Sequence, residues 1–129
     1  MRLEFLLLIA ALTISPCVAM AGSPIPKGAK QVISSVHSAA AKRDLPALRA
    51  LMTDEFTWSF GGDSNPDQAI ATWRSDPSAI AALRRITSKS CGRISEQFIQ
   101  CPQNAGVSYR AGFTETPFGW RMAYFVAGD

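Results

Sequence analysis

Two hydrophobic periodicities divide this chain, and together they constrain the fold more than any other feature. Most of residues 29–86 carries apolar side chains at helical spacing, for example Val32, Val36 and Ala40 on one face. Residues 107–126 instead alternate with period two, which is the pattern of strands. Because the helical patterns come first and the strand patterns follow, the sequence predicts an α+β fold, with N-terminal helices packed on a curved antiparallel sheet.

Three predicted helices begin with the same sequence pattern. An Asp or Asn that can cap the helix is followed by a proline in the first helical turn. The capping residues are Asp44, Asn65 and Asp76. The helix that follows Asp44 is expected to end at residues 53–55. The expected buried faces of these three helices comprise Leu45, Leu48, Leu51, Ile70, Trp73, Ile80, Leu83 and Ile86.

The clearest single strand signal is the segment Phe56–Phe60, where aromatic and small polar residues alternate. Its three aromatic side chains, Phe56, Trp58 and Phe60, are expected to face inward and to pack on the Val32 and Val36 helix face. Residues 94–101 form a weaker strand candidate.

The first 21 residues have the build of a secretory signal peptide. Arg2 gives a basic start, an apolar run follows from Phe5 to Ile14, and Ala19-Met20-Ala21 provides a small-residue cleavage site. We therefore expect an exported protein, periplasmic or secreted, that begins after Ala21. Residues 22–28 would form a flexible lead-in and residues 29–129 a single domain.

Cys17 offers an alternative interpretation, as a lipid-attachment cysteine just after the apolar run. Pro16 directly before it fits such a site poorly, because small residues are expected there. Cleavage after Ala21 would discard Cys17 and leave two cysteines, Cys91 and Cys101. In an exported protein this pair predicts a disulfide. A metal site or a reactive thiol is the alternative, but no Cys-x-x-Cys motif occurs, and we expect neither a metal nor a cofactor.

Charge excludes some classes of partner. The chain has a formal net charge of +3, and its basic residues are scattered, with Arg84-Arg85 as the only two adjacent arginines. Nucleic-acid binding normally needs a basic patch, so we expect no nucleic-acid partner. No long apolar stretch follows the signal segment, so we expect no membrane span in the mature chain.

Two segments resemble the NTF2-like (SnoaL-like) α+β cone superfamily. The first is residues 39–48 running into residues 54–56, and the second is residues 119–126. The resemblance implies helices wrapped by a curved sheet, with a pocket inside the cone. Some members are isomerases or cyclases, whereas others bind ligands or dimerise. The chain is short for the family and offers one strand where the family has a hairpin, and no position matches a catalytic acid of the family. The closing strands also allow a small SH3-like barrel, with the helices in a separate subdomain.

His37 and Asp63 are the candidate catalytic residues. His37 is the only histidine, and it lies at the edge of an apolar helix face, from which it could enter a pocket. Asp63 follows two glycines and could act as a general base on a flexible loop. The structural alternatives are half-exposed packing for His37 and a turn or capping role for Asp63.

Five residues are candidates for ligand binding. Arg110 and Arg121 lie on neighbouring predicted strands and could clamp an anion, or they could simply be solvated. Trp58, Tyr109 and Tyr124 could line the interior of a cone together with His37, or could fill the core. This constellation predicts a small, neutral, apolar ligand.

The sequence therefore leaves three functions open. The first is an exported domain that binds a small apolar ligand or a protein partner, with a homodimer as one form of that partnership. The second is an acid–base enzyme of the NTF2-like type that uses His37 or Asp63. The third is an envelope interaction protein that uses a basic sheet face.

Overall fold

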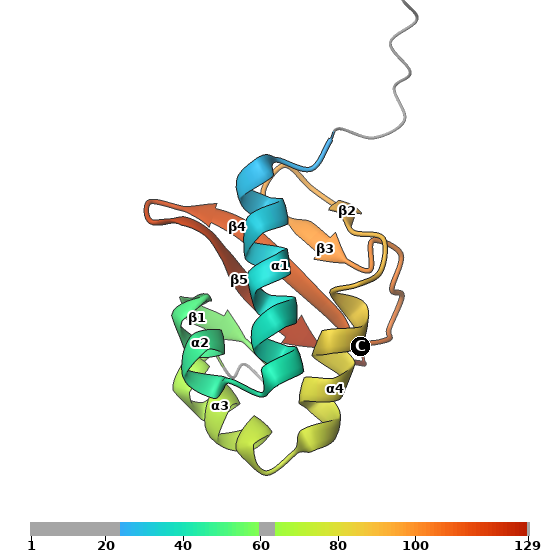
Figure 1. Ribbon diagram of the computed structural model, residues 1–129. Coiled ribbons are helices and arrows are strands. Elements are labelled where there is room, and N and C mark those ends of the chain that lie inside the picture. Colours follow the sequence, from blue (N-terminus) through green and yellow to red (C-terminus); the bar gives the residue numbers. More distant parts are fainter. Residues whose placement is uncertain (1–23, 60–63, 129) are drawn as a thin grey trace, which may run out of the picture.

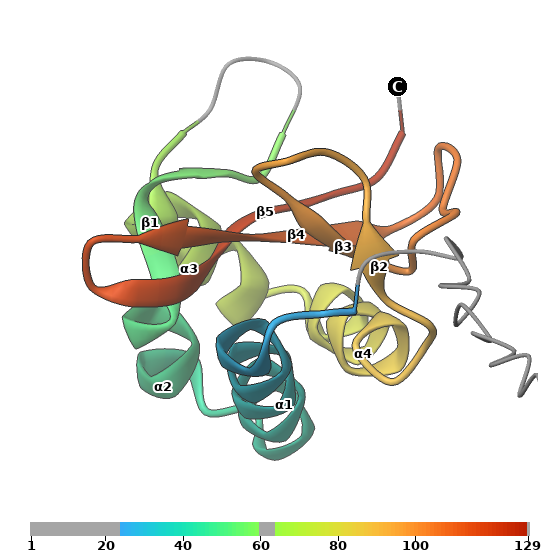
Figure 2. The same ribbon diagram turned by 90° about the horizontal axis from the view of Figure 1, so that it is seen from above.

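The computed structural model describes residues 24–59 and 64–128, and this part of the chain forms four helices on one face of a five-stranded sheet (Figures 1 and 2). The predicted α+β class is confirmed. The signal segment, Phe60 and Asp63 lie outside the described residues. The elements are α1 (Lys27–Lys42), α2 (Leu45–Ala50), β1 (Met52–Thr57), α3 (Pro66–Arg74), α4 (Pro77–Ile86), β2 (Gly92–Arg93), β3 (Ile99–Cys101), β4 (Arg110–Thr116) and β5 (Gly119–Val126).

The sheet is mixed and open, with the strand order β1-β5-β4-β3-β2. Strands β2 to β5 pair antiparallel with their neighbours, as the sequence predicted, but β1 pairs with β5 in parallel. A parallel pair needs a long crossover connection between its strands, and α3, α4 and the other strands provide it here. The prediction of an antiparallel sheet is therefore wrong for the β1–β5 pair.

The three predicted caps are confirmed at the level of individual hydrogen bonds. The Asn65 side chain accepts from the backbone N–H groups of Asp67 and Gln68 at 2.9 and 3.2 Å. The Asp76 and Asp44 carboxylates accept from the backbone at the starts of α4 and α2. Each cap contributes about 1 kcal/mol, so the helix starts are fixed locally.

The helices and the sheet share one hydrophobic core. The apolar face of α1 packs on β4 and β5, and α4 packs beside α1 on the same side of the sheet (Figures 1 and 2). A separate helical subdomain beside an SH3-like barrel is therefore wrong, because one continuous set of side chains fills the interior. The largest fully buried side chains are Phe56, Phe113, Leu48, Leu83, Ile99 and Met122.

The first strand lies earlier in the sequence than predicted. Residues 53–55 were expected to end a helix, but they lie within β1, because the backbone N–H of Met122 donates to Leu51 O at 2.7 Å and the two strands then run together. Phe56 faces inward as predicted and shares the core with Val32 and Val36, and its ring meets Trp73 of α3 edge-on, at 5.7 Å between centroids. Trp58 follows the strand and is half-buried.

Of the predicted strand over residues 94–101, only the last three residues are extended, as β3, and residues 94–98 form a loop. The strand paired with β3 across this loop is β2, which lies just before the predicted range. The Ser95 hydroxyl accepts from the backbone N–H groups of Gln97 and Phe98 at 3.3 and 3.1 Å. This local turn competes with extended backbone, which explains why the strand does not continue.

The predicted disulfide is confirmed. Cys91 and Cys101 have their Sγ atoms 2.06 Å apart and their Cα atoms 4.3 Å apart, with a sequence separation of 10. The bond closes a loop that contains β2 and most of β3.

Reduction of this disulfide should lower the free energy of unfolding. A loop of this length corresponds to on the order of 2–3 kcal/mol in the chain-entropy model. Urea unfolding of the protein with and without a thiol reductant measures the difference. Equal unfolding midpoints for the two forms would contradict the expectation.

Phe56→Ala should cost about 3–5 kcal/mol, because it removes a fully buried ring from contact with Trp73. Phe118→Ala is the matched control, since Phe118 is 84% exposed, and its effect should stay within about 0.5 kcal/mol. Chemical denaturation of both variants provides the test. Similar losses in the two variants would show that burial is not the cause.

Candidate ligand-binding site

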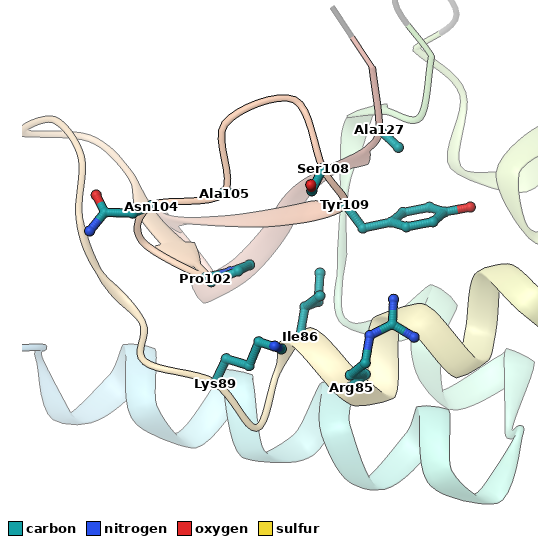
Figure 3. A pocket seen from close by; sticks show the side chains of 9 residues that line it. All are labelled: Arg85, Ile86, Lys89, Pro102, Asn104, Ala105, Ser108, Tyr109 and Ala127. Atoms are coloured by element: carbon teal, nitrogen blue, oxygen red, sulfur yellow. The ribbon is translucent and has the colours of Figure 1, made fainter.

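A pocket of about 480 Å³ opens beside the C-terminal end of α4 (Figure 3). One wall comes from the end of α4 and the turn that follows it, and the other from the segment 102–109 that connects β3 to β4. The end of β5 completes the pocket. The lining residues are Arg85, Ile86, Lys89, Pro102, Asn104, Ala105, Ser108, Tyr109 and Ala127.

Two cations give this pocket its charge. Arg85 belongs to the last turn of α4 and Lys89 lies three residues beyond its end, and both line the pocket, with Ile86 between them in the view of Figure 3. Among the described residues, no Asp or Glu lines the pocket. Arg85 also has a structural reason for its place, since cations stabilise the last turn of a helix. Lys89 lies beyond the helix, so the helix dipole explains its position less well.

The remaining lining residues are neutral and of two kinds. Asn104, Ser108 and Tyr109 carry side-chain hydrogen-bond donors, and Pro102 and Ala127 join Ile86 in providing apolar surface. Figure 3 shows the Arg85 guanidinium extending from α4 toward the ring of Tyr109. The pocket can therefore offer positive charge, neutral donors and apolar contact to one ligand at the same time.

The far end of the segment 102–109 is held by Arg110. Its guanidinium donates to Ser108 O and to Gly128 O, both at 3.0 Å, and the Gly128 N–H donates to Val107 O at 2.7 Å. The Tyr109 ring stacks on Phe125 of β5, with centroids 5.3 Å apart and an interplanar angle of 18°. Tyr109 is thereby fixed in the pocket wall.

The near end of the same segment is held by Gln100, a buried side chain. Its Nε2 donates to Pro102 O at 3.2 Å and to Gln103 O at 3.3 Å, and its Oε1 accepts from the Tyr124 hydroxyl. A buried amide with these partners has both of its donor hydrogens and its acceptor in use, which avoids the cost of unpaired polar groups. Gln100 therefore fixes the backbone where the pocket wall begins.

Tyr124 lies on the sheet face away from the helices. Its neighbour Phe125 meets Trp73 of α3, and successive strand residues point to opposite faces. The Tyr124 ring covers Gly112 on β4, where an added Cβ would lie 1.9 Å from Cε1 of the ring. Position 112 therefore requires glycine, because any larger residue would collide with the Tyr124 ring.

Burial raises the pKa of the Tyr124 phenol above its ordinary value, although the nearby Arg110 charge acts in the opposite direction. The raised pKa means that Tyr124 contributes stability below pH about 10, and that this contribution is lost as the pH rises through the folded-state pKa. Wild type should therefore lose stability above pH 10 more steeply than Tyr124→Phe, as measured by denaturation at a series of pH values. Parallel curves for the two proteins would show that the phenol is not responsible.

The other predicted ligand-binding residues are not brought together. Arg110 pairs with Val126 and Arg121 with Thr114, so the two arginines are separated by about 13 Å along the sheet and do not form a clamp. Tyr109 and Tyr124 lie on opposite faces of the sheet. Trp58 lies at the edge of the core, and its buried indole Nε1 has no hydrogen-bond partner among the described residues.

His37 lies at a second pocket, on the other side of Lys89. Its Nδ1 is 2.9 Å from Arg84 O and 3.0 Å from Thr87 Oγ1. Because a carbonyl oxygen can only accept, Nδ1 carries a proton and donates it to Arg84 O. Asp63, the second catalytic candidate, lies outside the described residues, so the structure places no carboxylate for it.

Arg85 and Lys89 were missed as site residues in the sequence. The sequence shows Arg84-Arg85 as its only two adjacent arginines, and this pair is the one signal that pointed to the site. Nothing in the sequence pattern shows that residues 102–109 fold over the end of α4, because that contact depends on the sheet and the disulfide.

No protein-family model, curated protein or solved structure matches this chain. The resemblance to NTF2-like proteins therefore stays a prediction. In the described part of the chain, no helix has the length and apolar character needed to cross a membrane, and no group of three metal-ligating side chains gathers.

Proposed function

We propose that this protein is an exported ligand-binding domain whose pocket beside α4 holds a small amphipathic anion, such as a carboxylate attached to an apolar ring. The observation that carries the proposal is the pairing of Arg85 and Lys89 in a pocket with no carboxylate among its described lining residues. The sequence predicted a small apolar ligand. The proposed ligand keeps the apolar part and adds a negative charge.

Electrostatics favour an anion for a simple reason. Arg85 and Lys89 carry like charges and line the same pocket, so they repel each other, and a bound anion would be attracted to both. A hydrogen bond to a charged group contributes roughly 1.5–3 kcal/mol, and an arginine can bind a carboxylate with two parallel bonds. A neutral ligand would leave both cations without a partner in the pocket.

Shape and composition favour a ligand with an apolar part. Ile86, Pro102 and Ala127 provide apolar contact, and the Tyr109 ring forms part of the wall. A volume of about 480 Å³ falls within the range of roughly 300–1,000 Å³ that is usual for small-molecule sites. Inorganic anions would use the cations but would leave this apolar surface in water.

Export is supported by two features of the chain. The first 21 residues have the composition of a signal peptide, and the Cys91–Cys101 pair is at disulfide distance. Disulfides persist mainly in oxidising compartments such as the periplasm or the extracellular medium. A ligand from the periplasm or the medium would then reach the pocket directly.

The other functions considered above stay predictions. His37 has one ring nitrogen held by α4, which suits an oriented base, but no described acidic residue lines its pocket. A protein partner, a second copy of this chain and a basic sheet face are likewise untested.

The ligand proposal predicts a difference between two probes of the same shape. By isothermal titration calorimetry, 2-naphthoate should bind wild-type protein, and 2-naphthamide, which lacks the charge, should bind at least about tenfold more weakly. Arg85→Gln should weaken naphthoate binding by a similar factor. Arg84→Gln is the matched control, because Arg84 lies in the same helical turn but does not line the pocket, and it should change the affinity less than about twofold.

Three results would contradict the proposal. The first is equal affinity of the two probes, and the second is an equal effect of the two arginine substitutions. The third is absence of naphthoate binding to folded wild type at millimolar concentration.

A further inference from the structure

The Cys91–Cys101 disulfide joins the two walls of the ligand pocket. Cys91 lies two residues after Lys89, on the wall formed by α4 and its turn, and Cys101 directly precedes Pro102, where the opposite wall begins. The bond holds the two Cα atoms 4.3 Å apart. The spacing of the walls at this end of the pocket therefore depends on a covalent bond.

The hydrogen bonds around the disulfide connect the same two segments. The Gln103 N–H donates to Ser90 O at 2.9 Å, and its Nε2 donates to Arg93 O at 3.2 Å. Both bonds lie on exposed or partly exposed chain, where water competes for the same groups and the net stabilisation is small. Without the disulfide, Gln100 would still fix the backbone of the near end and Arg110 the far end, but the two Gln103 bonds would have to hold the near end against the turn after α4.

The two sulfur atoms differ in access. Cys101 is fully buried, whereas Cys91 is partly exposed and lines the second pocket, of about 370 Å³, next to His37. Lys30 and Lys89 line this second pocket as well. Two positive charges beside the accessible sulfur favour the approach of a thiolate, the species that attacks disulfides.

We propose that the disulfide is a redox switch of the ligand pocket, so that the oxidised protein binds its anionic ligand and the reduced protein releases it. This inference rests on the proposed function, since it concerns the affinity of the same pocket. A thiolate of a dithiol reductant attacks Cys91 Sγ, the Cys91–Cys101 bond breaks, and Cys101 leaves as a thiolate that takes a proton from water. The second thiol of the reductant then attacks the mixed disulfide and releases Cys91, so the reductant ends as a disulfide after giving two electrons.

The test compares oxidised protein, protein reduced with dithiothreitol, and a Cys91→Ala/Cys101→Val variant that refills the buried site. Calorimetry with 2-naphthoate measures affinity, and hydrogen exchange of the Gln103 amide reports the near end of the pocket wall without any ligand. We expect at least tenfold weaker binding and at least tenfold faster exchange in the reduced protein and in the variant. Near-ultraviolet circular dichroism should show that both remain folded.

The possible results separate the two proposals. Affinity and exchange within twofold of the oxidised protein would overturn the switch. Global unfolding of both the reduced protein and the variant at 25 °C would overturn it as well, because a switch must release one wall and leave the rest folded. If the oxidised protein does not bind naphthoate, the proposed function is wrong. The role of the disulfide in holding the wall is then judged by Gln103 exchange alone, and equal exchange rates in the oxidised and reduced proteins would reject it.

Discussion

Contact of the Phe125 ring with its neighbours links the hydrophobic core to the pocket. On the helix side, Phe125 meets Trp73 of α3 edge-on at 5.5 Å, and Trp73 in turn meets Phe56 of β1. Toward the pocket, the same ring stacks against Tyr109. Phe125 lies on β5, an interior strand of the sheet that pairs with both β1 and β4. Packing of the helices and orientation of the pocket wall therefore depend on one buried ring.

The pocket is built from segments that are far apart in the sequence and held by few bonds. The wall over residues 102–109 has no regular strand or helix of its own, yet Gln100, the disulfide and Arg110 fix its two ends. Fixing a binding loop in advance reduces the ordering cost that a ligand would otherwise meet. This explains why buried polar residues such as Gln100 are retained in a small domain, where an apolar side chain would otherwise be the simpler choice.

For the proposed ligand pocket, the local arrangement of charges matters more than the net charge of the chain. A formal net charge of +3 is modest, and most basic side chains are dispersed over the surface. Arg85 and Lys89 are both exposed, and they differ from the other surface cations in lining one pocket together with the apolar groups of Ile86, Pro102 and Ala127.

The sequence by itself determined the features that depend on neighbours along the chain. The caps at Asn65 and Asp76, the alternation that produced β4 and β5, and the pairing of two remaining cysteines all follow from short-range chemistry or from elimination. These interactions act within a few residues, so a pattern in the sequence is enough to reveal them.

Only the tertiary structure decided the rest. The parallel register of β1 depends on a strand about seventy residues away, and local propensity at residues 53–55 could not reveal it. Arg110 and Arg121 were separated by the ladder register, and Arg110 became a support for the pocket wall. The pocket itself exists because the sheet and the disulfide carry residues 102–109 over the end of α4, and such long-range contacts leave no periodic signal in the sequence.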